Sequence, residues 1–238
     1  MAFITLPRPY VAFLACVWLC LAIAFPIRHE LVIGASLVEM SNERTFHARD
    51  AAKLDDPSRL AYLPPDEAAA TIGLMPGMVI ADIGTGTGYF SIPFARRIGP
   101  LGRVFAVDLQ REMLQLLDAK LETIAERGGI ELMEGTASET HLPDSSCDLA
   151  FLANIWHELD DRESVLAEAA RILRSGGRIA ILDWRLDVSG PPGPPAEHRV
   201  SHAEVESLLT RCRWTVEQSS TFGSYSYIVV AKAPMEDR

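Results

Sequence analysis

The sequence predicts an α/β fold, in which a doubly wound, mostly parallel sheet has helices on both faces and ends in an antiparallel hairpin. From Pro64 onward, short apolar runs alternate with amphipathic helical patterns, which is typical of a parallel sheet covered by helices. Two segments of alternating hydrophobicity close the chain and predict the hairpin. The 238 residues suit one domain with a short appendage, and the 48% hydrophobic content is that of an ordinary globular protein.

The predicted parallel strands are short apolar runs bounded by charged, glycine or proline residues that end regular structure. Such a continuous run is typical of a strand buried on both faces of a sheet. The five runs are residues 78–83, 103–107, 130–133, 149–153 and 178–183.

The predicted helices carry start and stop signals. Two prolines followed by two acidic residues open the first helix, and a capping box of Ser201 and Glu204 opens the last. The glycine pairs Gly128-Gly129 and Gly176-Gly177 are expected to end two others. The expected helices are residues 64–74, 89–98, 111–127, 161–173 and 201–211, and the hairpin strands are residues 214–220 and 225–231.

Charge and cysteine content narrow the function classes. The net charge is −10, from 22 basic and 32 acidic residues, so the surface repels phosphate backbones and we expect no nucleic-acid partner. Cys16 and Cys20 lie in an apolar run, whereas Cys147 and Cys212 stand alone, without a CxxC motif or a histidine at metal-ligand spacing. We therefore expect neither a disulfide scaffold nor a metal site.

The N-terminus carries a separate apolar segment. Residues 10–25 (YVAFLACVWLCLAIAF) are apolar throughout, yet shorter than the roughly 20 residues that cross a bilayer. Arg8 precedes the run, and Ala22-Ile23-Ala24 has the small-x-small pattern of a signal-peptidase site. We interpret residues 1–39 as a signal peptide or membrane anchor, or as mistranslated sequence upstream of a start at Met40. Residues 40–238 then form a single domain.

A glycine-rich loop, DIGTGTG from Asp82 to Gly88, joins the first predicted strand to its helix. Alternate glycines let the backbone turn tightly and approach a ligand closely. The dinucleotide fingerprint GxGxxG needs a third glycine where this chain has Tyr89. A carboxylate at the strand end also suits a positively charged ligand better than a diphosphate.

Asp108 ends the second predicted strand, twenty positions after Gly88. An acid at this place accepts hydrogen bonds from ribose hydroxyls in several cofactor classes. Asp108 therefore predicts a ribose-containing cofactor without choosing among them. Asp82 and the missing third glycine disfavour a nicotinamide dinucleotide.

Over residues 61–233 the chain resembles the class I S-adenosylmethionine-dependent methyltransferases. The segments that carry the resemblance are VIADIGTGTGYFS, VFAVDLQREML, GTASETHLPDSSCDLAFLANIWHEL and RILRSGGRIAILDW, in this order and spacing. The resemblance implies a Rossmann-like fold and S-adenosylmethionine as the methyl donor.

The resemblance also implies which residues hold the donor. The loop residues are expected at its amino-acid end, Asp108 at the ribose, Leu109 on the adenine, and the pair after the third strand at the adenine edge. The family commonly has Asp at the first position of that pair, where this chain has Thr136. The implied cofactor-binding residues are Asp82, Gly84, Thr85, Gly86, Gly88, Asp108, Leu109, Thr136, Ala137 and Asn154.

Candidate catalytic residues follow the fourth predicted strand. Methyl transfer from a sulfonium is a direct displacement, so a general base is needed only if the acceptor must lose a proton. His157 is the candidate base, and the resemblance implies that Asn154 lines the floor near the transferred methyl. A zinc-protease HExxH motif is excluded because Asp161 replaces its second histidine. The tetrapeptide (N/D)PP(Y/F) of many amino-group methyltransferases is absent, which disfavours nucleobase and amide acceptors.

The acceptor is expected to be a small molecule. Arg185, the stiff loop 190–195, His198 and the hairpin tip near Tyr225 are expected to border its site, because they follow strand five or close the sheet. Within the family that the chain resembles, we expect quinone-ring C-methyltransferases to be related to it. An apolar segment at residues 10–25 would suit a lipophilic acceptor and membrane association.

Three functions are compatible with these residues. Methyl transfer to a small, lipophilic acceptor leads, and a non-catalytic cofactor-binding module or membrane-tethered scaffold is the alternative. An NAD(P)-dependent oxidoreductase is disfavoured by the glycine register. S-adenosylmethionine is made in the cytosol, so we expect the domain in the cytoplasm or on the cytoplasmic face of a membrane, with export as the alternative.

Overall fold

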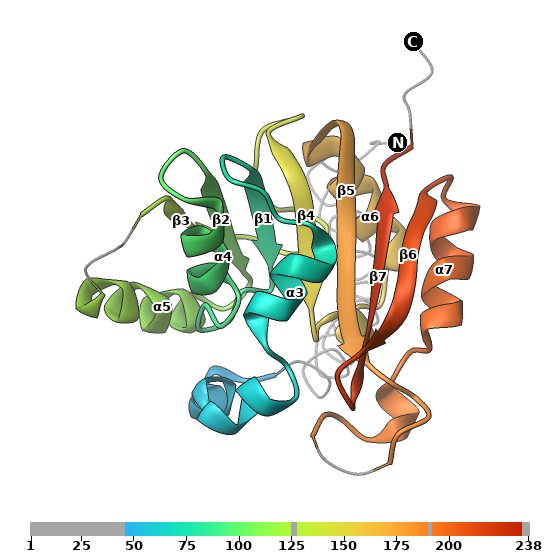
Figure 1. Ribbon diagram of the computed structural model, residues 1–238, viewed down its shortest axis with the longest axis horizontal. Helices are drawn as coiled ribbons and strands as arrows, with labels where there is room; N and C mark the ends of the chain where they lie inside the picture. The colour runs from blue at the N-terminus through green and yellow to red at the C-terminus, as the bar shows by residue number, and fades with distance from the viewer. Residues whose placement is uncertain (1–45, 125–127, 190–191, 235–238) are drawn as a thin grey trace, which may run out of the picture. The chain divides into compact units, whose positions relative to one another are not determined.

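The computed structural model describes residues 46–124, 128–189 and 192–234, and it has the predicted α/β architecture. Its seven-stranded sheet has the order β3-β2-β1-β4-β5-β7-β6 (Figure 1). The first five strands pair in parallel, while β7 runs antiparallel to both β5 and β6. The strands are β1 (Val79–Ile83), β2 (Arg103–Asp108), β3 (Ile130–Glu134), β4 (Cys147–Ala153), β5 (Leu173–Trp184), β6 (Thr215–Phe222) and β7 (Ser226–Lys232).

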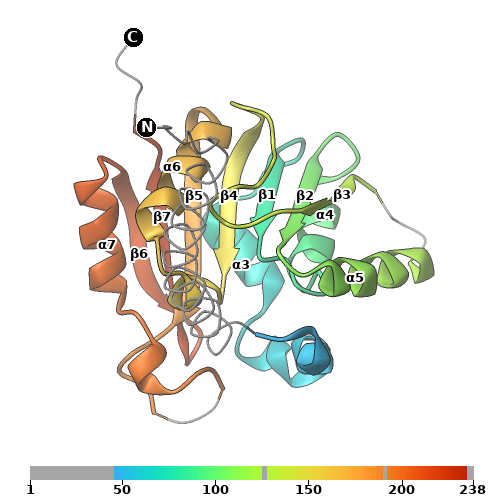
Figure 2. The same cartoon turned by 180° about the vertical axis from the view of Figure 1, so that it is seen from behind.

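Helices cover both faces of the sheet, as predicted. One apolar cluster contains the buried residues of α3, α4 and α5, and a second contains those of α6 and α7. Figure 1 shows α3 and α4 in front of the sheet, and Figure 2 shows α6 in front of the opposite face. The helices are α3 (Pro65–Ile72), α4 (Ser91–Ile98), α5 (Arg111–Thr123), α6 (Arg162–Ile172) and α7 (His202–Arg211).

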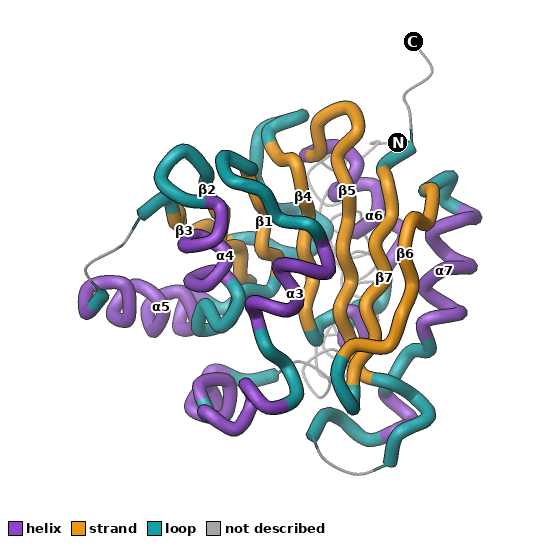
Figure 3. The backbone as a smooth tube through the Cα atoms, in the orientation of Figure 1, coloured by secondary structure: helices purple, strands orange, loops and turns teal. Residues whose placement is uncertain are grey.

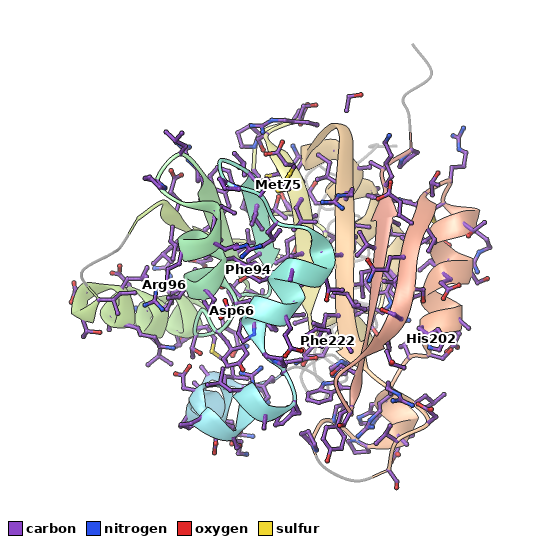
Figure 4. The ribbon with its side chains drawn as sticks, viewed as in Figure 1. Asp66, Met75, Phe94, Arg96, His202 and Phe222 are labelled. Atoms are coloured by element: carbon purple, nitrogen blue, oxygen red, sulfur yellow. The ribbon has the colours of Figure 1, made fainter. Side chains whose placement is uncertain are left out.

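Buried apolar side chains attach each helix to the sheet. In α4, Phe94 is buried beneath the helix, whereas Arg96 lies on its exposed side (Figure 4). The Phe94 ring lies with its centroid 4.9 Å from that of Phe151 on β4. In α7, the predicted capping box of Ser201 and Glu204 is present.

Neither glycine pair ends the helix that it was expected to end. The helix expected over residues 111–127 ends at Thr123, and Ile124 is already extended. The helix expected over residues 161–173 ends at Ile172, within one residue of the prediction, but what ends it is the pairing of Leu173 with Cys147, which begins β5. The pair Gly176-Gly177 lies inside an irregular stretch of that strand, so strand pairing outweighs the local stop signal.

Residues 46–61, where the sequence predicted neither a helix nor a strand, contain two 3₁₀ helices. These are η1 (Ala48–Asp55) and η2 (Pro57–Ala61). Figure 3 shows this segment and the connection that follows β5 at the same edge of the sheet. Parallel strands end at this edge, which is where α/β proteins bind their ligands.

The apolar segment at residues 10–25 and the predicted boundary at Met40 lie outside the described residues. Within the described ranges, none of the helices is long and apolar enough to cross a bilayer.

Candidate methyl-donor and acceptor site

The glycine loop is held by its own backbone amides. The N–H groups of Gly84 and Thr85 donate to the carbonyl of Val107 at 2.8 and 3.0 Å. The amide of Gly86 donates to Oδ2 of Asp108 at 2.8 Å, and that of Gly88 donates to the Thr85 carbonyl at 3.0 Å. These amides are therefore committed to the protein and are not arrayed to receive a diphosphate.

Asp82 lies beneath the loop and is only 2% exposed. Its Oδ2 atom accepts hydrogen bonds from Ser91 Oγ at 2.5 Å and from Thr85 Oγ1 at 3.1 Å. Burial raises the pKa of Asp82 to about 6, although the two hydroxyl groups oppose the shift. The side chains of Asp82 and Thr85 thus brace the loop from within, so any contact they have with a ligand is limited by this bonding.

Gly84 lies where a side chain has no room. Its φ of +75° is a conformation that residues with a Cβ rarely adopt. A Cβ there would lie 2.7 Å from Cγ2 of Ile155, the residue after Asn154. The absence of a side chain at Gly84 therefore lets the loop after β1 approach the loop after β4.

Asp108 is the second buried carboxylate of the site. Its Oδ1 atom accepts from the Gln110 amide at 2.8 Å, while Oδ2 accepts from Gly86. Burial raises the pKa of Asp108, whereas these two N–H groups oppose that shift. Each carboxylate oxygen has further acceptor capacity, so Asp108 fits the hydroxyl groups of a ribose.

The predicted adenine contacts lie at the next two strand ends. Leu109 is 59% exposed, so its side chain is open to packing against a planar ring. Thr136 is exposed, and its hydroxyl lies 3.3 Å from that of Ser138. Ala137 is partly buried against the core.

Asn154 occupies the end of β4 in a strained conformation. Its φ is +57°, a left-handed region that asparagine tolerates better than most residues. Its amide donates to the Leu182 carbonyl at 2.8 Å, whereas the side-chain Oδ1 atom is buried and has no hydrogen-bond partner among the described residues. An orphaned acceptor beside the glycine loop suits a cationic ligand group, such as the ammonium of S-adenosylmethionine.

His157 forms a buried pair with Asp183, the acid at the end of β5. The His157 Nδ1 atom lies 2.8 Å from Oδ1 of Asp183, and the His157 amide donates to Oδ2 at 3.0 Å. Because a carboxylate can only accept, Nδ1 carries the hydrogen and Nε2 of the neutral ring is left as a proton acceptor. Burial favours the neutral ring, but the carboxylate outweighs it and raises the pKa of His157.

Sequence reasoning missed Asp183 as a functional residue. The signal was an acid, Asp183, at the end of the apolar run predicted as the fifth strand. Only the order of the sheet, with β4 beside β5, brings the two side chains together.

Glu158 extends this group of ionisable side chains. Its Oε1 atom accepts from the Phe46 amide at 3.2 Å and lies 3.9 Å from Nε2 of His157. Burial raises the pKa of Glu158 to about 7, against the charge of His157 and the Phe46 N–H.

Residues 46–61 form a cap on the site that the sequence did not reveal. The Gln110 side chain accepts from the Ala48 amide at 3.0 Å and donates to the Phe46 carbonyl at 2.7 Å. Asp55 accepts from Thr87 Oγ1 at 2.8 Å. The cap is therefore bonded to the glycine loop, to the residue after Leu109 and to Glu158.

An aromatic cluster of Tyr62, Trp184 and Tyr225 lies where β5 ends. The Tyr62 ring centroid is 6.3 Å from that of Trp184 and 5.8 Å from that of Tyr225. The Arg185 amide donates to the Tyr225 carbonyl at 2.8 Å, which joins the end of β5 to the hairpin tip. Two residues expected to border the acceptor, Arg185 and Tyr225, are thus neighbours.

Arg199 organises the described part of the connection after β5. Its guanidinium is largely buried and donates to the carbonyls of Arg185, Val188, Pro192 and Pro194. His198, in η4 (Ala196–His198), has no role in this network that the structure identifies. Gly190 and Pro191 lie outside the described residues.

This fold and site define an S-adenosylmethionine-dependent methyltransferase, and the comparisons with known proteins agree. Residues 81–181 match the model of a family described as a methyltransferase domain. A solved S-adenosylmethionine-dependent methyltransferase from Aquifex aeolicus is 31% identical, with a TM-score of 0.75 over 79% of this chain and 99% of that one. The chain belongs to the class I S-adenosylmethionine-dependent methyltransferases.

Curated relatives match the central part of the chain. A ubiquinone/menaquinone biosynthesis C-methyltransferase from Enterobacter sp. (strain 638) is 29% identical over 119 residues, which are 50% of this chain and 47% of the relative. The same enzyme from Hahella chejuensis is 32% identical over 112 residues, 47% of this chain and 45% of the relative. The match thus spans about half the length of these curated relatives.

Proposed function

We propose that this chain transfers a methyl group from S-adenosylmethionine to a small organic acceptor. The observation that carries this proposal is the position of two buried, hydrogen-bonded pairs. One lies on each side of the point between β1 and β4 at which the strand order reverses. Asp108 bonded to Gly86 lies on the donor side, and Asp183 bonded to His157 lies on the other. When bound, S-adenosylmethionine supplies an electrophilic methyl group on a sulfonium.

Each residue has a defined role in this proposal. Asp108 accepts hydrogen bonds from the ribose hydroxyls, and the orphaned Oδ1 of Asn154 accepts from the ammonium group. Nε2 of His157 takes the proton that the acceptor loses as its new bond to the methyl carbon forms and the methyl–sulfur bond breaks. Asp183 holds the imidazole in the required tautomer and stabilises its protonated form.

The acceptor class that we favour is a hydroxylated aromatic ring. The relatives named above act in ubiquinone and menaquinone biosynthesis, and Tyr62, Trp184 and Tyr225 offer aromatic surfaces at the end of β5. In this proposal residues 40–238 are the catalytic domain, working in the cytoplasm or at its face of a membrane. Residues 10–25 would provide membrane association.

Calorimetric titration of the full chain with S-adenosylhomocysteine tests the donor site, with NADH as the competing ligand. We expect S-adenosylhomocysteine alone to bind, with affinity reduced at least tenfold in Asp108→Ala. The matched control is Glu134→Ala, which removes a half-exposed acid on β3. Glu134 lies opposite Asp108 in the register of β2 and β3. Binding of NADH instead would overturn the proposal.

Methyl transfer is then measured with donor labelled in the methyl group and a panel of hydroxylated aromatic compounds. The proposal expects label in at least one ring and loss of this transfer in His157→Gln with donor binding retained. Donor binding without transfer to any panel member or to a lipid extract would favour the non-catalytic alternative.

A further inference from the structure

Arg59, in the cap, is a buried cation that the proposed reaction leaves unused. Its residue is 7% exposed, and one guanidinium nitrogen donates to the Leu54 carbonyl. The guanidinium carbon lies 3.9 Å from the centroid of the Tyr89 ring, and the Tyr62 side chain also interacts with it. Among the residues that the structure describes, Arg59 makes no ion pair with a carboxylate.

The nearest acid of the cap does not supply a counter-ion. Asp55 is committed to two other groups, since its Oδ1 atom accepts from Thr87 at 2.8 Å and from Lys120 at 2.6 Å. Removing a guanidinium from water without a paired anion costs free energy. Burial accordingly lowers the pKa of Arg59, although Tyr89, Tyr62 and Asp55 oppose that shift. The other N–H groups of the Arg59 guanidinium thus remain as donors for an anion.

The position of Arg59 connects the two halves of the site. Leu54, whose carbonyl it bonds, has Cδ1 3.0 Å from the place of a Cβ on Gly86. Tyr89 directly follows the glycine loop, and Tyr62 belongs to the aromatic cluster. The guanidinium is therefore next to both the donor loop and the side on which we place the acceptor.

We infer that Arg59 is the binding site for a carboxylate held between the glycine loop and the aromatic cluster. A planar guanidinium binds a carboxylate through two parallel hydrogen bonds and stacks on an aromatic ring, as this one does on Tyr89. The inference rests on the proposed function, which gives the carboxylate two sources. One is the amino-acid end of the methyl donor, and the other is an acidic group on the aromatic acceptor.

Calorimetry on the full chain separates the sources. S-adenosylhomocysteine and 5′-methylthioadenosine share the nucleoside and the sulfur, but only the first has the amino acid. Benzoate, titrated into protein saturated with S-adenosylhomocysteine, is the probe for an aromatic acid on the acceptor side. Each titration is repeated with Arg59→Met, Arg59→Lys and the control Arg49→Met, which removes an exposed guanidinium from η1 of the same cap.

If the donor supplies the carboxylate, Arg59→Met weakens S-adenosylhomocysteine at least tenfold and leaves 5′-methylthioadenosine unchanged. If the acceptor supplies it, both nucleosides bind as before and benzoate binding is lost. Arg59→Lys retains part of the affinity in either case, and Arg49→Met changes nothing.

The inference is overturned if neither the ratio of the two nucleoside affinities nor benzoate binding changes in Arg59→Met. Unaltered 5′-methylthioadenosine binding also shows that a variant is folded. Failure of both nucleosides to bind the unmodified chain would instead remove the donor site itself, and with it the proposed function.

Discussion

His157 follows β4 and Asp183 lies at the end of the neighbouring strand β5, so the two are 26 residues apart in sequence, yet their side chains meet at 2.8 Å in a buried pair. Asp183 also accepts from the His157 backbone amide, and Trp184 donates its own amide to the same carboxylate. The carboxylate is therefore oriented by two amides before it orients the imidazole. Such a pair can hold a proton at Nε2 and return it, which is what proton loss from a methyl acceptor requires.

Asp183→Asn is expected to move the pH dependence of methyl transfer. The base must be neutral, so activity falls as pH drops through the pKa of His157, which the Asp183 carboxylate raises. Removing that charge lowers the pKa, so the acidic limb of kcat/KM shifts to lower pH. The maximal rate falls roughly 100-fold because the imidazole becomes a weaker base.

The control for this prediction is Asp187→Asn, which removes an exposed carboxylate paired with Arg185. This variant should leave both the acidic limb of kcat/KM and the maximal rate of methyl transfer unchanged. If the acidic limb of kcat/KM stays at the same pH in Asp183→Asn, the Asp183 carboxylate has a structural role alone.

Gly84→Ala is expected to abolish close contact between the loops after β1 and β4. The new Cβ would lie 2.7 Å from Ile155, so the loop must shift and S-adenosylhomocysteine affinity should fall at least tenfold. Gly77→Ala is the matched control, since Gly77 has φ of +85° and open space around it. Both variants carry a backbone strain of about 1 kcal/mol, seen as a lower Tm.

The two glycine variants are compared by calorimetry. Equal losses of affinity would mean that general destabilisation, rather than the approach of Ile155 to the loop, controls donor binding.

Gln110→Ala is expected to loosen the cap. The side chain makes hydrogen bonds to Phe46 and Ala48, each contributing about 1 kcal/mol. Hydrogen exchange of the Ala48 amide should become roughly fivefold faster, and S-adenosylhomocysteine should bind more weakly. Gln115→Ala, at an exposed position of α5, should alter neither measurement. Unchanged exchange at Ala48 in Gln110→Ala would contradict the prediction.

Glu158→Gln is expected to change how stability depends on pH. Burial raises the pKa of Glu158 to about 7, so its contribution is fully present below an ordinary glutamate pKa of 4.5 and is lost as pH rises through 7. Glutamine cannot ionise, yet it still offers an oxygen to the Phe46 amide. Relative to the unmodified chain, the free energy of unfolding of the variant should therefore increase by on the order of 3 kcal/mol between pH 4 and pH 8.

The measurement is the free energy of unfolding from urea titrations at several pH values. Glu163→Gln, at an exposed position of α6, serves as the control and should follow the unmodified chain. If the difference in the free energy of unfolding between Glu158→Gln and the unmodified chain stays constant across this pH range, burial does not raise the pKa of Glu158.

The sequence predicted the parts of this protein that depend on local chemistry. Apolar runs predicted all five parallel strands, and the signal is clearest for β1, β2 and β4, because a strand buried on both faces has nowhere to place polar side chains. The glycine loop predicted close backbone approach, and its φ of +75° at Gly84 agrees. The glycine pair Gly176-Gly177 failed as a helix stop for the opposite reason, since the pairing of Leu173 with Cys147 that ends the helix is a contact between distant segments.

What the sequence by itself determined was the fold class, the order of the elements and the glycine loop between the first strand and its helix, since each depends on residues close together in the chain. Only the tertiary structure decided which groups meet across the edge of the sheet. The pairing of His157 with Asp183 required β4 and β5 to be neighbours, and the burial of Arg59 required the cap to lie on Tyr89. Periodicity and local motifs carry no information on such contacts, because they form between segments whose spacing in sequence is unrelated to their distance in space.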